Sequence, residues 1–148
     1  MYGAIPKGSL IGISPVILEK DGAGTFAAGD FVKFSSGEYV VGTAAAAVAG
    51  VALEAGTSSS EDVQANITPY LMVLMDNDND GTTFASTHPG TYFDFIGATG
   101  VMQVDTSSTS STSGCLLCLE YNPQGVGLDS DTSIGKYVVI ESLFNTLA

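Results

Sequence analysis

The sharpest chemical pattern in this chain is the run Asp-Asn-Asp-Asn-Asp-Gly at residues 76–81. Oxygen-bearing side chains at alternate positions, followed by glycine, match the first half of a calcium-binding EF-hand loop. The match then ends, because the twelfth position is Thr87 instead of a bidentate glutamate and the flanking residues are strand-like. The pattern therefore predicts a solvated acidic hairpin tip, with Asp76, Asp78 and Asp80 as an alternative candidate site for calcium or magnesium.

Cys115 and Cys118 have the CxxC spacing of zinc and redox motifs. A tetrahedral zinc site needs four ligands, and the chain contains no third cysteine and one histidine. A redox motif would need a helix start within a βαβ unit, which the sequence lacks. Residues three apart in a strand point to opposite faces, so we expect two diverging thiols that are buried and reduced.

The single histidine, His88, lies in a His-Pro-Gly turn. A general base needs a nucleophile within reach, and no serine lies in a G-x-S-x-G turn, so we expect an exposed turn residue. Asp94 and Asp105 could face each other across two strands, although strands carry scattered acids routinely and spacing alone does not make a catalytic pair. We therefore predict no catalytic residue, no cofactor and no enzymatic activity.

The elements that position these residues are predicted to be strands. The 148 residues suffice for one domain, and 18 glycines with 45% apolar residues favour a turn-rich, mainly β protein that closes into a compact barrel or sandwich. Residues 106–113, Thr-Ser-Ser-Thr-Ser-Ser-Thr-Ser, are predicted to be an exposed loop with little fixed structure. Strands are expected over residues 31–34, 38–41, 48–54, 82–86, 90–96, 100–104, 115–121 and 136–143, and in two pieces between 63 and 75 that meet at a bend.

The N-terminal residues have the pattern of an extended segment, because Pro6 and Pro15 exclude the interior of a regular helix. This segment is either an ordinary edge strand or an arm that reaches a neighbouring subunit. Its apolar, strand-like residues are Leu10, Ile11, Ile13, Val16 and Ile17.

The charge balance excludes several classes of partner. Sixteen acidic residues face four lysines and no arginine, which gives a net charge of −12. Such a chain is repelled by nucleic acid and by anionic membrane surfaces, and it lacks the residue best suited to bidentate phosphate recognition. Lys33 and Lys136 interrupt apolar strands, where they either protect exposed strand edges or meet acidic patches on a partner. Because no secretory signal or membrane span is visible, synthesis in a cytoplasm is expected.

Several short motifs together resemble the small capsid cement, or decoration, proteins of tailed bacteriophages. The motifs are GDFV at residues 29–32, a hairpin and a small-residue stretch, AGVALE at 49–54, GTYFDF at 90–95, GVMQVD at 100–105 and KYVVIESL at 136–143. The resemblance covers residues 27–143. It implies a β-tulip-like β domain (residues 27–148). The extended N-terminal arm (residues 1–26), expected from the residues themselves, lies outside the resemblance.

By the same resemblance, the protein would be a virion component on the outer capsid surface. It would form homotrimers, or dimers, and bind the major capsid protein over capsomer junctions. The arm residues Leu10, Ile11, Ile13, Val16 and Ile17, which lie outside the resemblance, are expected to be one of the contacts. The alternative is a surface-displayed module that binds glycan or calcium through residues 76–81 and the aromatic side chains of Tyr92, Phe93 and Phe95.

Overall fold

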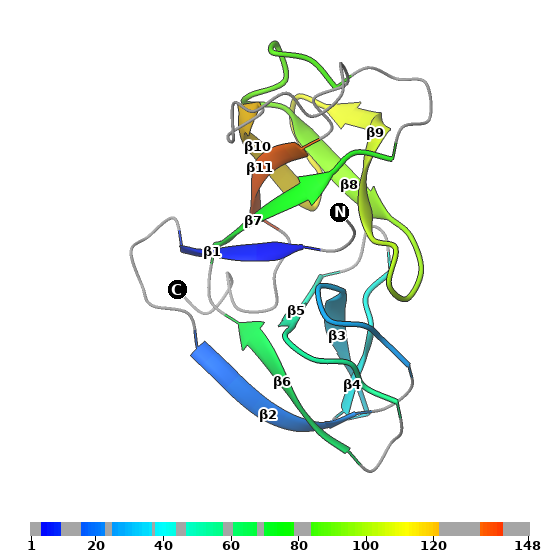
Figure 1. Cartoon of the computed structure of the whole chain (residues 1–148). Coiled ribbons are helices and arrows are strands. Elements are labelled where there is room, and N and C mark those ends of the chain that lie inside the picture. Colours follow the sequence, from blue (N-terminus) through cyan, green and yellow to red (C-terminus); the bar gives the residue numbers. More distant parts are fainter. Residues whose placement is uncertain are drawn as a thin grey trace.

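The computed structural model is built of strands (Figure 1). It describes residues 4–9, 16–22, 25–36, 38–43, 47–57, 61–67, 70–78, 84–121 and 134–140. Within these ranges there are eleven strands and no helix, so the predicted mainly β fold is confirmed. The strands are β1 (Ile5–Ser9), β2 (Val16–Gly22), β3 (Phe31–Ser35), β4 (Glu38–Val41), β5 (Gly50–Ala52), β6 (Glu61–Ile67), β7 (Leu71–Asp76), β8 (Tyr92–Ile96), β9 (Gln103–Ser110), β10 (Leu116–Tyr121) and β11 (Ile134–Val139).

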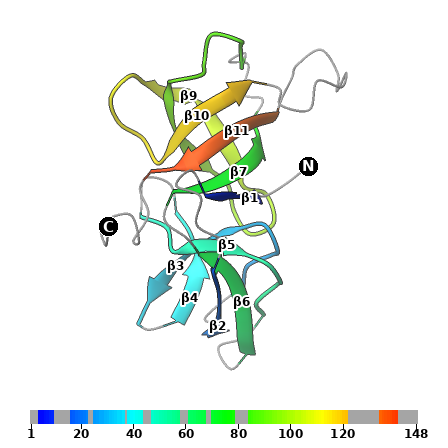
Figure 2. The same ribbon diagram turned by 90° about the vertical axis from the view of Figure 1, so that its left-hand side faces the viewer.

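Strands β2 to β6 close into a small barrel in the order β2-β4-β3-β5-β6, which forms the lower lobe in Figures 1 and 2. All of its pairs are antiparallel except β2 with β4, which meet in parallel at one residue pair, Gly22 and Tyr39. Gly50 allows β5 to pass close to β6, because a Cβ there would collide with the Asn66 carbonyl oxygen and the Ile67 side chain. Small residues therefore let this barrel close tightly.

The other strands form a six-stranded antiparallel sheet, the large sheet, in the order β1-β7-β11-β10-β8-β9. This sheet curls, so that its last strand, β9, returns to the end of β7, where Asn77 forms a parallel bridge with Val104. Strand β1 runs along the boundary between the two lobes (Figure 1). Two hydrophobic cores result, one inside the barrel and one inside the curled large sheet.

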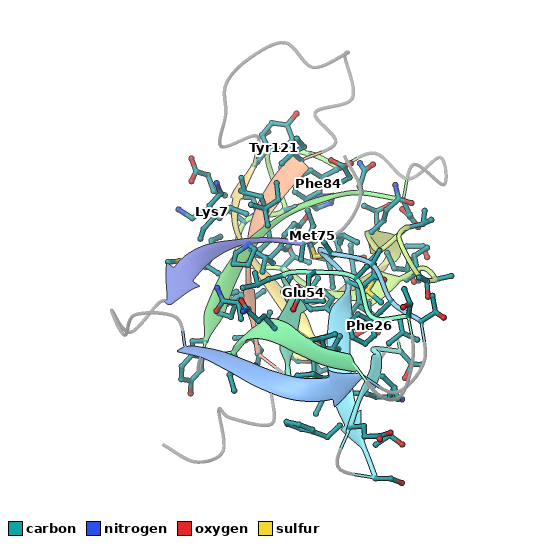
Figure 3. All side chains as sticks on the ribbon, turned by 60° about the horizontal axis from the view of Figure 1, so that its bottom comes forward. Lys7, Phe26, Glu54, Met75, Phe84 and Tyr121 are labelled. Carbon is teal, nitrogen blue, oxygen red and sulfur yellow. The ribbon has the colours of Figure 1, made fainter. Side chains whose placement is uncertain are left out.

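The large-sheet core is rich in aromatic rings. Phe84 packs against Phe93, Tyr121 and Tyr137, with ring centroids 6.1, 5.4 and 6.0 Å away. Phe84 and Tyr121 lie together in Figure 3, away from Phe26, which fills the barrel core. The predicted aromatic and β-branched strand positions thus supply most of both cores.

The polar run at residues 106–113 was expected to be a loop, and this prediction is wrong over its first half. Strand β9 continues through Ser110, and its Asp105 and Ser110 are Cα partners of Asp94 and Tyr92 in β8. Thr106 is fully buried, and threonine is a good strand former whose hydroxyl can be satisfied by a neighbour. Low sequence complexity therefore concealed an alternating strand.

The expected strand at residues 82–86 is also wrong where it is described, because residues 84–86 are not in a strand. Phe84 is nevertheless buried, and the chain turns directly after it. The two strand pieces predicted between residues 63 and 75 are confirmed as β6 and β7. Residues 68 and 69, where the bend was expected, lie outside the described residues.

The described parts of the N-terminal segment pair within their own chain. Strand β1 pairs with β7, and β2 pairs with β6 along its whole length, with Val16 opposite Ile67 and Ile17 opposite Asn66. This is the ordinary-strand arrangement for these two stretches. Leu10, Ile11 and Ile13 lie outside the described residues, and their contact with a neighbouring subunit stays a prediction.

Lys136 does not protect a strand edge, whereas Lys33 lies just beyond the last residue pair of β3 with β5, Val32 and Gly50. Lys33 lies in β3, which pairs with both β4 and β5, and Lys136 lies in β11, between β10 and β7. The Lys33 ammonium donates a hydrogen bond of 3.0 Å to Thr43 Oγ1, and that of Lys136 lies 3.8 Å from Glu120 Oε2. Both side chains therefore serve local surface contacts.

Candidate functional site

Residues 76–78 of the acidic motif contact residues 104–106 of β9. This contact, which we call the seam, joins β9 to the end of β7. Asp76 and Asn77 are buried, with 8% and 5% of their surface exposed. The Asp78 amide donates to the Val104 carbonyl (2.9 Å), and Asp78 Oδ1 accepts bonds from the Thr106 amide (3.3 Å) and hydroxyl (2.7 Å). The predicted solvated tip is therefore wrong for residues 76–78, because the extended β9 packs against them.

This seam accounts for part of the calcium-like pattern. The Asp78 carboxylate is engaged by Thr106, and no group of three or more His, Cys, Asp or Glu side chains in the described ranges is arranged to hold a metal ion. Asn79 and Asp80 lie outside the described residues.

Both cysteines are buried thiols that form no disulfide, as predicted. Burial raises the pKa of the Cys118 thiol to about 11, which disfavours the nucleophilic thiolate. The expected divergence to opposite faces does not apply, because Cys115 precedes β10 and both side chains lie in the same core. They behave as small core residues.

Asp94 and Asp105 do face each other, as Cα partners in β8 and β9. Each carboxylate, however, accepts hydrogen bonds from other groups of the chain and not from its partner across the strands. Asp94 Oδ1 accepts a bond from the Cys115 amide (3.2 Å), and Asp105 Oδ1 accepts bonds from the Ser107 amide (3.0 Å) and hydroxyl (2.6 Å). Both carboxylates therefore stabilise the local backbone, and their arrangement does not resemble a catalytic pair.

Among the acids whose burial the structure describes, Asp30 is the most deeply buried, and the sequence predicts it at the start of a core strand directly after a turn. No part of its surface is exposed. Its Oδ2 accepts a bond from the Ala27 amide (2.8 Å), and both carboxylate oxygens lie within 3.0 Å of the Gly100 amide. Thr99 reinforces this contact through a 2.8 Å bond from its hydroxyl to the Thr25 carbonyl. The sequence signal was an acid placed between a turn glycine and an apolar strand.

Apolar contacts complete the same junction between the lobes. The Phe31 amide lies 3.0 Å from Met102 Sδ, and the Phe31 and Phe95 rings are 4.8 Å apart. We call residues 27–31 and 95–102 the lobe joint. It fixes the start of β3 in the barrel against the β8–β9 connection of the large sheet.

His88 is half-buried, so its expected exposure is wrong. Its Nδ1 accepts a 3.0 Å hydrogen bond from the Ala85 amide, and its ring lies 5.3 and 5.4 Å from the rings of Phe84 and Phe93. This partial burial lowers the pKa of His88 below its ordinary value. The imidazole is therefore held in place and neutral at pH 7.

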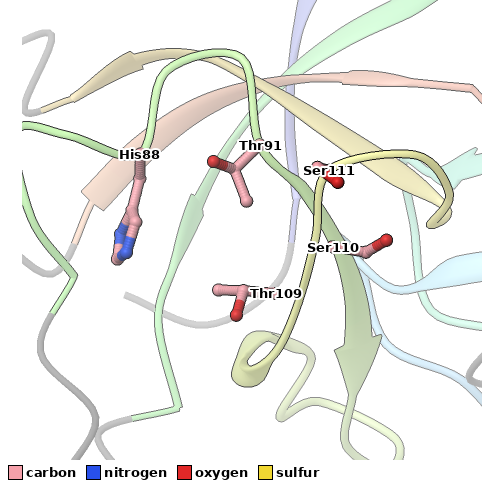
Figure 4. A pocket seen from close by; sticks show the side chains of 5 residues that line it. All are labelled: His88, Thr91, Thr109, Ser110 and Ser111. Atoms are coloured by element: carbon pink, nitrogen blue, oxygen red, sulfur yellow. The ribbon is translucent and has the colours of Figure 1, made fainter.

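A pocket of about 300 Å³ opens beside this ring (Figure 4). It was not predicted from the sequence, because its walls belong to the His-Pro-Gly turn and to the end of β9, which was taken for a loop. Its lining residues are His88, Thr91, Thr109, Ser110 and Ser111.

The aromatic platform predicted for a glycan site does not exist on the surface as proposed. Phe93 and Phe95 are buried in the large-sheet core, with 0% and 1% of their surface exposed, and Tyr92 is half-buried. The inward positions of β8 alternate with outward ones, which sends both phenylalanines to the core.

In the part of the chain that the structure describes, there is no helix long and apolar enough to cross a membrane. Comparison with known proteins gives no match, either to a family model or to a curated protein or solved structure.

Proposed function

We propose that this chain is a structural virion protein, a capsid cement or decoration protein that binds the outer surface of a phage head and stabilises capsomer junctions. The observation that carries the proposal is the lobe joint. Asp30 of the GDFV motif bonds to Gly100 of GVMQVD, and Phe31 packs on Phe95 of GTYFDF. Motifs that are separate in the sequence thus belong to one structural unit.

The AGVALE motif joins the same unit through the backbone. The Gly29 amide donates to the Ala52 carbonyl (2.8 Å), and the Ala52 amide donates to the Asp30 carbonyl (2.9 Å). The residues that carry the resemblance therefore build a scaffold. A scaffold of this kind suits a protein whose function comes from surface contact.

The proposed mechanism is burial of surface between the protein and the shell. In the described ranges, the carboxylates of Asp30, Asp78, Asp94 and Asp105 all accept bonds from the chain's own backbone or hydroxyl groups, which suits a rigid module. Each Å² of apolar contact contributes roughly 25 cal/mol, and a subunit that contacts several capsid proteins at once multiplies modest contacts.

The outer face of the shell is the proposed location because of charge. A net charge of −12 opposes contact with packaged DNA. The proposed contacts are the apolar residues Leu10, Ile11, Ile13, Val16 and Ile17 of the N-terminal segment. The proposed partners are the major capsid protein and further copies of this chain in a homotrimer or dimer.

The test is addition of purified protein to phage heads that lack their cement protein. We expect a light-scattering mass of a trimer or dimer that EDTA and calcium leave unchanged, saturable binding to the outer surface in electron micrographs, and a higher temperature of head disruption. Ile11→Asp should weaken head binding, whereas Ser113→Asp, at an exposed position, should not. A monomer that leaves the heads undecorated would contradict the proposal.

A further inference from the structure

The pocket beside His88 has walls that are fixed by the chain itself. On one side, the Thr91 amide donates to the His88 carbonyl (2.9 Å), and the Gly90 amide donates to the Cys118 carbonyl (2.9 Å), which ties the turn to β10. On the other side, Ser110 Oγ accepts bonds of 3.2 Å from the amides of Thr112 and Ser113. The cavity is therefore preformed, as ligand sites usually are.

The pocket surface presents hydroxyl groups. Four of its five lining residues are serine or threonine, and the fifth is His88 (Figure 4). Within the described part of the chain, the hydroxyls of Thr91 and Thr109 have no protein hydrogen bond, so both can donate to and accept from a ligand. Ser110 Oγ already accepts two amide bonds and keeps its proton for donation.

His88 adds a donor whose tautomer is fixed. Its Nδ1 accepts from the Ala85 amide, so in the neutral imidazole the proton resides on Nε2. The rings of Phe84 and Phe93 lie 5.3 and 5.4 Å from the imidazole. The lining residues therefore offer one N–H donor and several hydroxyls that act in both directions.

The lack of charged side chains in the pocket lining limits the class of ligand that can bind. No lysine, arginine, aspartate or glutamate lines the pocket, so a phosphate or carboxylate finds no countercharge and a divalent cation finds no carboxylate. The chain's net charge of −12 disfavours anions further. The volume of about 300 Å³ lies at the small end of ligand pockets.

We infer that this pocket binds a neutral saccharide ring, either as a free sugar or as the terminal unit of a glycan. A sugar hydroxyl donates and accepts at once, which matches a wall of Thr91, Thr109 and Ser110 hydroxyls with the His88 Nε2–H donor. This sugar binding is separate from capsid binding. It would use a different site from the glycan site expected from the sequence, which involved Phe93, Phe95 and the acidic motif.

The test uses the single histidine of the full chain, whose imidazole proton resonances report on His88 without further assignment. The probes are glucose, galactose, mannose and N-acetylglucosamine, with glucuronate and N-acetylneuraminate as anionic counterparts. We expect at least one neutral sugar to shift the His88 resonance saturably with a millimolar Kd. An array of immobilised oligosaccharides then separates the two sources, since a terminal glycan unit would bind there more tightly than the free sugar.

Two variants on different walls place the binding in the pocket. Thr91→Val and Thr109→Val each remove one hydroxyl with little change of shape, and each should weaken binding about tenfold, because one hydrogen-bonding partner of the bound sugar is lost. The matched control is Thr112→Val, at an exposed position beyond the lining residues, which should bind as the parent does.

The inference fails if no neutral sugar gives a saturable shift, if the anionic sugars bind more tightly than the neutral ones, or if both pocket variants bind as the parent does. The free variants are checked by their melting temperature and His88 resonance, so that a folding defect is not read as lost binding. The two proposals are independent: a protein that binds no sugar can still bind phage heads, and a protein that binds no phage heads can still bind a sugar.

Discussion

Both carboxylate oxygens of Asp30 receive the amide N–H of Gly100, at 3.0 and 2.9 Å, across a sequence separation of 70 residues. The acid belongs to the barrel side of the lobe joint and the glycine to the β8–β9 connection. Gly100 adopts φ of +77°, a left-handed conformation that favours glycine. The two lobes are thus fixed by a fully buried carboxylate aimed at a backbone amide.

Replacement of this acid should loosen the joint. Asp30→Ala leaves the half-buried Ala27 and Gly100 amides without their acceptor and should lower the free energy of unfolding by about 2 kcal/mol. Urea denaturation measures the change. Asp105→Asn, which affects a local bond to Ser107 at the surface, is the control and should cost less than about 1 kcal/mol. Equal stability of the two variants would show that Asp30 does not secure the joint.

The Tyr137 hydroxyl is buried without a hydrogen-bond partner in the described structure. Removal of an unsatisfied polar group relieves its desolvation, so Tyr137→Phe should keep or raise the free energy of unfolding, by up to about 1 kcal/mol. Tyr137→Leu, which also removes ring packing on Phe84 and Phe93, should cost about 2 kcal/mol or more. Thermal unfolding measures both, and a clear loss in Tyr137→Phe would reveal a hidden partner for the hydroxyl.

Two glycines should respond to alanine for different reasons. At Gly50 a Cβ would meet the Asn66 carbonyl oxygen, so Gly50→Ala should cost about 3 kcal/mol through overpacking. At Gly90 nothing lies within 4 Å of the added Cβ, but φ is +88°, so Gly90→Ala should cost only about 1 kcal/mol of backbone strain. Chemical denaturation of both variants checks the order, and a tolerated Gly50→Ala would mean that β5 and β6 are less closely packed.

His88 should titrate below 6.5, because burial disfavours its charged form. Protonation at Nδ1 would also break the bond from the Ala85 amide. The unfolded chain then binds more protons than the native one in this window, so stability is present above the unfolded pKa and is lost as the pH falls through the folded pKa. The imidazole resonance of the native chain gives the native midpoint, with the urea-unfolded chain as reference. A native midpoint at or above that of the unfolded chain would contradict the geometry.

The sequence predicted the β class and several strands because these depend on local patterns. The hairpin of β3 and β4 follows from aromatic and β-branched residues around a turn, and β6 and β7 follow from two apolar stretches around Pro69. Both thiols were correctly predicted to be buried because cysteine is small and apolar.

What could not be predicted depends on distant partners. In the sequence, Asp30 looks like an ordinary turn acid, and only the fold shows that it binds the Gly100 amide. In the same way, Asp78 looks like a calcium ligand, and only the fold shows that its carboxylate binds Thr106. The pocket was missed because it requires β9 to extend to Ser110, and a serine- and threonine-rich run gives no apolar alternation to reveal that strand.

The pairing of Ser9 with Leu71 makes the barrel an insertion within the large sheet, since β2 to β6 all lie between these two residues in the chain. On the ribosome, β1 emerges before its partner β7 and must wait for it until the barrel has been synthesised. The barrel, complete once β6 is made, can fold before that sheet begins to assemble. Strand β1 is therefore made before the barrel but can be joined to β7 only after all the barrel strands have been made.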